Sequence, residues 1–244
     1  MLKKKWLLKP EPNNQTVSQL EQELGIHKGI CQLLAQRGLD SFDKAKHFFR
    51  PTKHQIHNPM LMKNMDEAVQ RIKNAIKGNE KILIYGDYDV DGTTAVAMVY
   101  SFFKEYHQNI SYYIPDRHNE GYGISFKSID YAKENNIQLI IALDCGIKAI
   151  NEVIYAKSKG IDYIICDHHL PGETIPNGIV LNPKQKECPY PFKELSGAGV
   201  GFKLLQAFCK QNNINTQKAN KHLDLLAISI GADMVPLIEE NRVL

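Results

Sequence analysis

The sequence lacks any segment long and apolar enough to serve as a secretion signal or to cross a membrane. Its start, MLKKKWLLKPEP, is basic, but the apolar stretch after the lysines covers only Trp6 to Leu8. A signal peptide needs about 7–15 apolar residues and a spanning helix about 20. The sequence also shows no internal repeat and no low-complexity tract. We therefore expect a cytoplasmic protein that does not bind a membrane.

Cysteine is scarce, and its positions form no metal-binding or redox motif. The chain has five cysteines, which is an odd number, and no C-x-x-C pair. They are Cys31, Cys145, Cys166, Cys188 and Cys209. This pattern argues against a disulfide framework and predicts reduced thiols, as in a cytoplasmic protein.

A strong charge of either sign is also missing. The formal net charge is +3 and the pI is near 8.4, which is only mildly basic. Taken alone, this balance does not identify a nucleic-acid-binding protein. The apolar fraction of 43% and the charged fraction of 23% are ordinary for a globular protein. A length of 244 residues permits one large domain or two small ones.

The first quarter of the chain consists of helix-like pieces between helix breakers. Short helices are predicted over residues 18–24, 29–37 and 41–49. Ser41 is a suitable N-cap for the third helix. A longer helix follows, with apolar residues from Met65 to Ile76 on one face and Gly78 after it. We expect residues 1–62 to form a helical N-terminal extension and residues 63–244 to form the main domain.

From residue 81 onward, short apolar runs rich in β-forming residues alternate with amphipathic helical stretches. The predicted strands are KILIYGD (81–87), SYYIPD (111–116), QLIIALD (138–144), DYIICD (162–167) and GIVLNP (178–183). Helices are predicted over residues 93–106, 125–135, 149–158, 200–211 and 217–230. Such alternation is typical of a parallel sheet covered on both faces. The predicted fold is a doubly wound α/β domain with a mostly parallel five-stranded sheet.

Three of these strands end in acidic residues. Their ends read Asp87-Tyr-Asp89-Val-Asp91-Gly, Asp144-Cys-Gly and Asp167-His168-His169. A further acid, Asp233, follows the last predicted helix. The ligand crevice of an open parallel sheet lies at the carboxyl ends of its strands, so we expect the strand-end acids to meet at one edge.

Crowded carboxylates repel one another unless a cation compensates them. Carboxylates with one or two imidazoles suit Mn²⁺ or Mg²⁺ better than Zn²⁺. Because the acids outnumber the ligands that one ion needs, the pattern predicts two ions, about 3.5–4 Å apart, of the kind that promote attack on phosphorus.

Other interpretations of the same residues are open. A single Asp at a strand end is often a turn residue or an N-cap, and His168-His169 alone would suit a surface loop. The run D-x-D-x-D-G also resembles the start of a calcium loop, but the twelfth position from Asp87 is Met98 instead of Glu. The three strand-end signals together favour the metal site.

These segments resemble the four motifs of the DHH phosphoesterase superfamily. The motifs are GDYDVDG (86–92), ALDCG (142–146), DHH (167–169) and GADMVPL (231–237). Within the superfamily, the chain resembles the bacterial RecJ family of single-strand-specific exonucleases. The segments that carry this resemblance are LLAQRGLDSFDKAKHFFRP (33–51), PDRHNEGYG (115–123), DHHLPGETIPNGIVLNP (167–183), LSGAGVGFKLL (195–205) and ENRVL (240–244).

The resemblance, which covers about residues 30–244, implies a role for each motif residue. The implied metal ligands are Asp87, Asp89, Asp91, Asp144, His168 and Asp233. Asp144 stands where the family has its bridging carboxylate. The implied catalytic set is Asp144, His168, His169, Asp89 and Asp91. Asp167 would hold a metal-ligand residue in the correct orientation without binding the metal itself, and His169 would contact the scissile phosphate. Tyr85 departs from relatives that carry a histidine at this position, so the first metal site would depend on Asp87.

Further positions are candidates for binding the substrate. Arg117 offers a bidentate fork for a phosphate oxygen, and a surface salt bridge is the alternative explanation. Tyr122 would stack on a base or fill a turn. Gly197 and Gly199 open a helix, so exposed N–H groups there would hold a phosphate; close helix packing gives the same pattern.

The resemblance implies a Mn²⁺- or Mg²⁺-dependent exonuclease with two ions. It would degrade single-stranded DNA in the 5′–3′ direction from a free 5′ end, in DNA repair and recombination. Relatives of this kind continue with a substrate-binding domain and an OB-type domain, so we expect this chain alone to bind metal but to cut DNA poorly. Single-strand-binding proteins and helicases are candidate partners that the sequence does not specify.

Three other functions are open at this point. A DHH phosphodiesterase of short oligonucleotides or cyclic dinucleotides would use the same motifs. A replication scaffold that keeps the fold would have lost ligands, whereas the acid set here is complete. A generic nucleotide-binding module would leave the strand-end acids unexplained.

Overall fold

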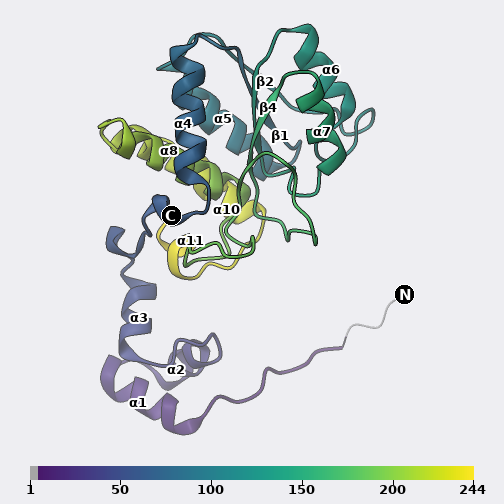
Figure 1. Ribbon diagram of the computed structural model, residues 1–244. Helices are drawn as coiled ribbons and strands as arrows, with labels where there is room; N and C mark the ends of the chain where they lie inside the picture. The colour runs from purple at the N-terminus through teal and green to yellow at the C-terminus, as the bar shows by residue number, and fades with distance from the viewer. Residues whose placement is uncertain (1–4) are drawn as a thin grey trace. The chain divides into compact units, whose positions relative to one another are not determined.

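The computed structural model describes residues 5–244 (Figure 1). These residues divide into two compact units, one up to residue 56 and one of residues 57–242. The domain boundary expected between residues 62 and 63 stays a prediction. No helix in the described part of the chain is both long enough and apolar enough to span a bilayer.

The N-terminal unit contains three short helices around a small core. They are α1 (Asn14–Leu24), α2 (Lys28–Ala35) and α3 (Phe42–Phe49), followed by the 3₁₀ turn η1 (Lys53–Gln55). Each α-helix begins at a side-chain cap, and the predicted cap Ser41 accepts a hydrogen bond from Lys44 N. The core side chains are Val17, Leu20, Cys31, Leu34 and Ala45.

The second unit is built on a five-stranded sheet in which all strands are parallel. The strands are β1 (Ile82–Gly86), β2 (Ile110–Tyr113), β3 (Leu139–Leu143), β4 (Asp162–Cys166) and β5 (Ile179–Leu181). Their spatial order is β2-β1-β3-β4-β5, and Ile82 pairs with Ile110 on one side and Leu139 on the other. Every predicted strand is present. For the central strands β1 and β3 the reason is that short apolar runs buried on both faces have few other stable conformations.

Helices cover both faces of the sheet, which confirms the doubly wound fold (Figure 1). One core packs Ile82, Ile84 and alternating residues of the other strands against α4 (Met65–Lys77), α5 (Val90–Lys104), α8 (Gly197–Gln211) and α10 (Leu223–Ala232). The other packs Leu83 and Tyr85 against α6 (Phe126–Glu134) and α7 (Ile150–Ser158). Successive residues thus face opposite sides, as the period of a strand requires.

Two helices at the edge of the sheet begin earlier than the sequence predicts. Helix α5 starts at Val90 instead of residue 93, because the Asp89 side chain caps it by accepting a hydrogen bond from Gly92 N at 2.9 Å. Helix α8 starts at Gly197 instead of residue 200, because Ser196 Oγ accepts from Gly199 N at 3.1 Å. Asp89, Asp91 and the glycine run are therefore parts of helix starts.

The C-terminal region differs from the prediction in two further ways. The helix expected over residues 217–230 is divided into α9 (Gln217–Asn220) and α10. A short helix, α11 (Glu239–Val243), ends the chain and was not predicted. The 3₁₀ turn η2 (Pro59–Leu61) precedes α4.

Candidate metal centre

Asp87 stands immediately after β1 and is fully buried. Neither of its carboxylate oxygens has a hydrogen-bond partner among the described residues. Burial raises the pKa of Asp87, and the adjacent Asp89 raises it further. Gly92 lies directly against this residue, since a Cβ there would come 2.6 Å from Asp87 N. The glycine of the first motif is thus needed for α5 to start close to the strand end.

Asp144 follows β3 in a left-handed backbone conformation, with φ of 60°. Its N–H donates to Cys166 O at 2.9 Å, which continues the pairing of β3 with β4 by one residue. The side chain is buried, and burial together with Asp91 and Asp89 raises the pKa of Asp144 to about 10. A non-glycine residue in this conformation costs free energy, which suggests a functional constraint.

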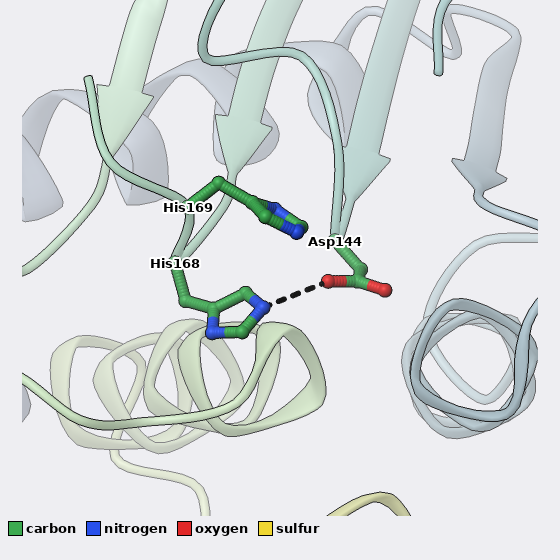
Figure 2. Close-up of side chains that lie close together, drawn as sticks. All are labelled: Asp144, His168 and His169. Carbon is green, nitrogen blue, oxygen red and sulfur yellow. Dashed lines mark ion pairs between the residues drawn. The ribbon is translucent and has the colours of Figure 1, made fainter. Parts of the chain in front are cut away.

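His168 lies among three carboxylates that come from distant parts of the sequence. Its Nε2 is 3.2 Å from Asp144 Oδ1, 3.6 Å from Asp233 Oδ2 and 3.9 Å from Asp91 Oδ2. Figure 2 shows the His168 ring directed at Asp144, with the His169 ring beside it. The predicted convergence of strand-end acids at one edge of the sheet is therefore present for this group.

Asp91 also accepts hydrogen bonds from two other helices. Its carboxylate accepts hydrogen bonds from Gly197 N at 2.7 Å and Ala198 N at 2.8 Å, and from Ser229 Oγ at 2.7 Å. A carboxylate at the first N–H groups of α8 satisfies donors that lack partners within the helix and interacts favourably with the helix dipole. Asp91 thus joins α5 to α8 and α10.

Asp167 holds the two histidines that follow it. Its Oδ1 accepts from His168 N at 2.7 Å and contacts His169 Nδ1 at 2.7 Å, while Oδ2 accepts from Ile147 N at 2.9 Å. Burial opposes ionisation of Asp167, but the hydrogen bonds from His169 and the backbone outweigh it and lower the pKa of this carboxyl. The same hydrogen bond raises the pKa of His169. Asp167 therefore orients the pair and favours the protonated form of His169.

His169 Nε2 is directed away from Asp167, toward Tyr122. The Tyr122 hydroxyl lies 3.2 Å from this nitrogen and 3.4 Å from Asp144 O. A pocket of about 300 Å³ opens beside the pair, lined by Ile124, Ile147 and Lys148 among others. Space for a substrate is thus available next to His169.

Arg117 lies at the same edge but is exposed and has no ion pair among the described residues. Its guanidinium is 5.5 Å from the centre of the Tyr88 ring, and Tyr88 in turn contacts Tyr122 edge to face. The structure therefore favours a cation–π contact over the alternative of a surface salt bridge for Arg117.

The expectation of exposed N–H groups at Gly197 and Gly199 is wrong. Both glycines are buried. Gly197 N donates to Asp91, and Gly199 N donates to Ser196 Oγ. The glycine run instead permits close packing, since a Cβ at Gly197 would come 2.5 Å from Asp144 Oδ1. We therefore assign these N–H groups no part in phosphate binding.

Tyr85, the departure from the family pattern, lies away from the carboxylates. Its ring is fully buried in the core under α6 and α7, and its hydroxyl donates to Gly123 O at 2.7 Å. It is thus a core residue that supports the loop of Tyr122.

Two site residues escaped the sequence analysis. Ser229 stands in the apolar helix LLAISIGA, where an isolated serine is a signal of a buried polar contact; it bonds Asp91 and Ser196. Asn182 is fully buried and donates to His169 O at 2.9 Å. Its position in the short strand end LNP gave no comparable signal.

The donor atoms at this edge suit a divalent cation. Asp144, His168 and His169 form one set whose ligand atoms all lie within 4.8 Å of one another, and Asp91, His168 and Asp233 form another. Asp144 Oδ1, Asp233 Oδ2 and both His168 nitrogens are buried and make no hydrogen bond. Buried polar atoms without partners are costly, so a ligand with positive charge fits here. Asp87 and Asp89 lie outside both sets.

Comparison with known proteins agrees with this geometry. The model of the DHH family, N-terminal domain, matches residues 81–230. The single-stranded-DNA-specific exonuclease RecJ of Bacillus subtilis is 40% identical over 243 residues, which are 99% of this chain and 30% of that protein. RecJ of Escherichia coli K12 is 35% identical over 88% of this chain and 38% of its own length. The chain thus spans about a third of these relatives.

Solved structures show the same similarity. A crystal structure of exonuclease RecJ bound to manganese matches with a TM-score of 0.68 and 32% identity, over 74% of this chain and 46% of that one. RecJ of Thermus thermophilus in complex with Mn²⁺ matches with a TM-score of 0.77 and 25% identity, over 96% and 32%. The first three motifs and their strand-end residues lie within the matched family region, and the fourth motif (231–237) directly follows it.

Proposed function

The chain belongs to the DHH family, and on this premise we propose that it is the catalytic portion of a metal-dependent exonuclease. The substrate would be single-stranded DNA with a free 5′ end, degraded in the 5′–3′ direction during DNA repair and recombination. The observation that carries the proposal is the position of His168 Nε2, within 4 Å of carboxylates from three motifs. The names of the relatives support the choice of substrate.

The residues that would hold metal are the two donor sets described above, with Asp144 and His168 at their centre. Asp87 and Asp89 would complete the coordination of a second ion at the end of β1. Bound Mn²⁺ or Mg²⁺ would offset the charge of the carboxylates and of the phosphate, and would supply a nucleophilic water near neutral pH. The manganese and magnesium complexes of RecJ support this choice of ions.

His169 is suited to contact the scissile phosphate. Asp167 holds it at Nδ1, which leaves Nε2 facing the open side of the crevice beside Tyr122. A protonated imidazole at this point would donate a hydrogen bond to a non-bridging oxygen and stabilise the charge that develops on it. Asp167 serves as the orienting partner of the histidine.

Arg117, Tyr88 and Tyr122 are suited to hold the strand. The three side chains adjoin one another through ring and cation–π contacts at the edge of the site. Aromatic faces stack on bases without regard to sequence, and a guanidinium binds phosphate oxygens. We propose that this group receives the nucleotides next to the scissile bond. Such an enzyme would act in the cytoplasm, with single-strand-binding proteins or helicases as candidate partners.

One experiment tests the metal-dependent activity. The full-length protein would be incubated with a long 5′-labelled single strand, with the same strand circularised, and with a dinucleotide, each with Mn²⁺ or EDTA. We expect degradation of the linear strand only, and only with metal. Cleavage of the dinucleotide without activity on the long strand would favour the DHH phosphodiesterases of small substrates.

A further inference from the structure

A fully buried ion pair lies outside the metal centre. Lys203, on α8, and Glu240, on α11, are both 0% exposed, and their side chains form a direct ion pair between Nζ and Oε1. Lys203 Nζ also donates to His57 O at 3.2 Å and to Gln206 Oε1 at 3.0 Å. All three protons of the ammonium group therefore have acceptors.

The carboxylate of Glu240 is equally well satisfied. Its Oε1 accepts from His57 N at 3.1 Å, and its Oε2 accepts from the Tyr190 hydroxyl at 2.6 Å. Tyr190 is fully buried, and its ring lies 5.8 Å from Lys203 Nζ. The network thus ties α11 to α8, to the segment that precedes α4, and to the loop that precedes α8.

Stability alone does not explain a buried network of this kind. Removing two charges from water costs several kcal/mol per ion, and well-packed apolar residues often give equal or greater stability. What a saturated ion pair provides is a fixed geometry between the elements that carry it.

Glu240 ends the segment that carries Asp233. Asp233 directly follows α10, and residues 234–238 connect it to α11. Met234, Leu237 and Ile238 in this connection are exposed, so the packing of these side chains does little to hold it. Asn241, next to Glu240, adds hydrogen bonds from Nδ2 to Glu194 O and Pro236 O.

The opposite end of the same segment is held through α8. Asp233 N donates to Ser229 O, and Ser229 Oγ donates to Asp91 Oδ1. The two oxygens of the Asp91 carboxylate also accept from the first N–H groups of α8. Lys203 lies six residues after Gly197, or about 9 Å along the helix axis. One rigid helix therefore contacts both ends of the Asp233 segment, while Gly197 at its start touches Asp144.

We propose that Lys203 and Glu240 are positioning residues that hold Asp233 in place against Asp91, Asp144 and His168. The ion pair fixes the far end of the Asp233 segment to the helix whose start contacts the other carboxylates. This inference rests on the proposed metal site and identifies the contacts that keep Asp233, the acid of the fourth motif, close to His168. Without the pair, α11 can shift and the Asp233 carboxylate loses its place near His168.

Mn²⁺ titration of the 244-residue chain by calorimetry and by electron paramagnetic resonance tests this inference. Glu240→Gln keeps the size of the side chain and removes its charge. We expect its affinity for Mn²⁺ to fall about tenfold, which is the lower end of the loss seen when a residue that orients a metal ligand is removed. We also expect the resonance signal of the bound ion to broaden, because the ligand field becomes heterogeneous.

Arg71→Met is the matched control. Arg71 pairs with Glu80 at 2.6 Å and with Asp162 at 2.8 Å, at the opposite ends of the strands from the metal centre. This variant should lower the melting temperature while leaving Mn²⁺ affinity unchanged. If the affinities of Glu240→Gln and the parent agree within twofold, or if both variants lose affinity equally, the positioning role is refuted.

The outcomes separate this inference from the proposed function. A parent chain that binds no Mn²⁺ refutes the metal site itself, whereas equal binding by parent and variant refutes only the positioning role. If Glu240→Gln does not fold, Tyr190→Phe removes a single hydrogen bond to Glu240 Oε2 and is measured in its place. A folded Tyr190→Phe with unchanged affinity and an unchanged resonance signal then counts against the proposal.

Discussion

Gly197 lies so close to Asp144 that a Cβ atom at position 197 would come 2.5 Å from Asp144 Oδ1 and 2.7 Å from its Cα. The start of α8 therefore rests on Asp144, the residue at the centre of the proposed metal site. Because Gly197 N also donates to Asp91, this single position links two of the acidic motifs.

Gly197→Ala is expected to weaken both stability and metal binding. The added methyl group must displace Asp144 or the start of α8, which costs roughly 1–3 kcal/mol in a well-packed interior. Unfolding in urea and Mn²⁺ calorimetry would measure the two effects. Gly231→Ala is the control, because a Cβ there meets no atom within 4 Å and Ala favours a helix by about 0.5–1 kcal/mol. If Gly197→Ala kept its Mn²⁺ affinity, the packing of Gly197 against Asp144 would not be needed for metal binding, and the prediction would be wrong.

Asp144 should make the metal-free protein less stable as pH rises. Burial and the nearby Asp91 and Asp89 raise the pKa of Asp144 to about 10, whereas an unfolded chain has a value of about 3.9. The folded state thus binds the proton more tightly, so this contribution to stability is complete below about pH 4 and is lost as pH rises toward 10. Asp144→Asn should flatten that dependence.

The measurement is urea unfolding with EDTA at pH 5 and pH 8. The parent should lose more stability between these values than Asp144→Asn does, and Mn²⁺ should restore the parent alone. Equal losses in the two proteins would show that Asp144 does not titrate as predicted.

Asp167→Asn should lower the pKa of His169. The hydrogen bond between Asp167 Oδ1 and His169 Nδ1, at 2.7 Å, raises the pKa of this imidazole, and an amide in its place supplies no negative charge. The protonated form would then be lost at a lower pH, and the alkaline limb of the activity profile would move in the same direction. A histidine NMR titration with metal-free protein measures the shift, and an unaltered His169 pKa would refute the coupling.

Tyr88→Ala should weaken binding of single-stranded DNA. If its ring stacks on a base beside Arg117 and Tyr122, the loss is roughly 1–3 kcal/mol of binding free energy. Tyr88→Phe should retain most of the affinity, since the aromatic face remains. Fluorescence anisotropy of a labelled strand provides the measurement. Tyr112→Ala is the control because this exposed tyrosine on β2 contacts Tyr100 instead; equal losses at both positions would exclude a specific role.

The sheet was predictable because its signal is local. Strands such as LIIAL of β3 are apolar at every position, and the bounds of all five strands differ from the prediction by at most three residues. The convergence of Asp144 and His168 followed from the rule that parallel strands end at the same edge. Sequence and elementary topology were sufficient for both.

The remaining features depend on contacts between distant residues. The N–H groups of Gly197 and Gly199 were expected to be exposed, but their partners, Asp91 and Ser196, could be identified only from the folded structure. Lys203 is a charged residue in a largely apolar stretch of α8, and its pairing with Glu240 across 37 positions leaves no periodic pattern. Helix α11 has only five residues, which is too short for a hydrophobic repeat to indicate it.

The hydrogen bonds of Asp91 also set an order of assembly. Its donors Gly197 and Ser229 come 106 and 138 residues later in the chain. Contacts at such separation form late, because a long loop must close before they are made. During synthesis, which proceeds at about 5–20 residues per second, the first acidic motif emerges many seconds before its donors. A nascent chain that ends before α8 therefore carries Asp91 without the donors that hold its carboxylate, and the acidic edge is complete only after α10 and Asp233 have been synthesised.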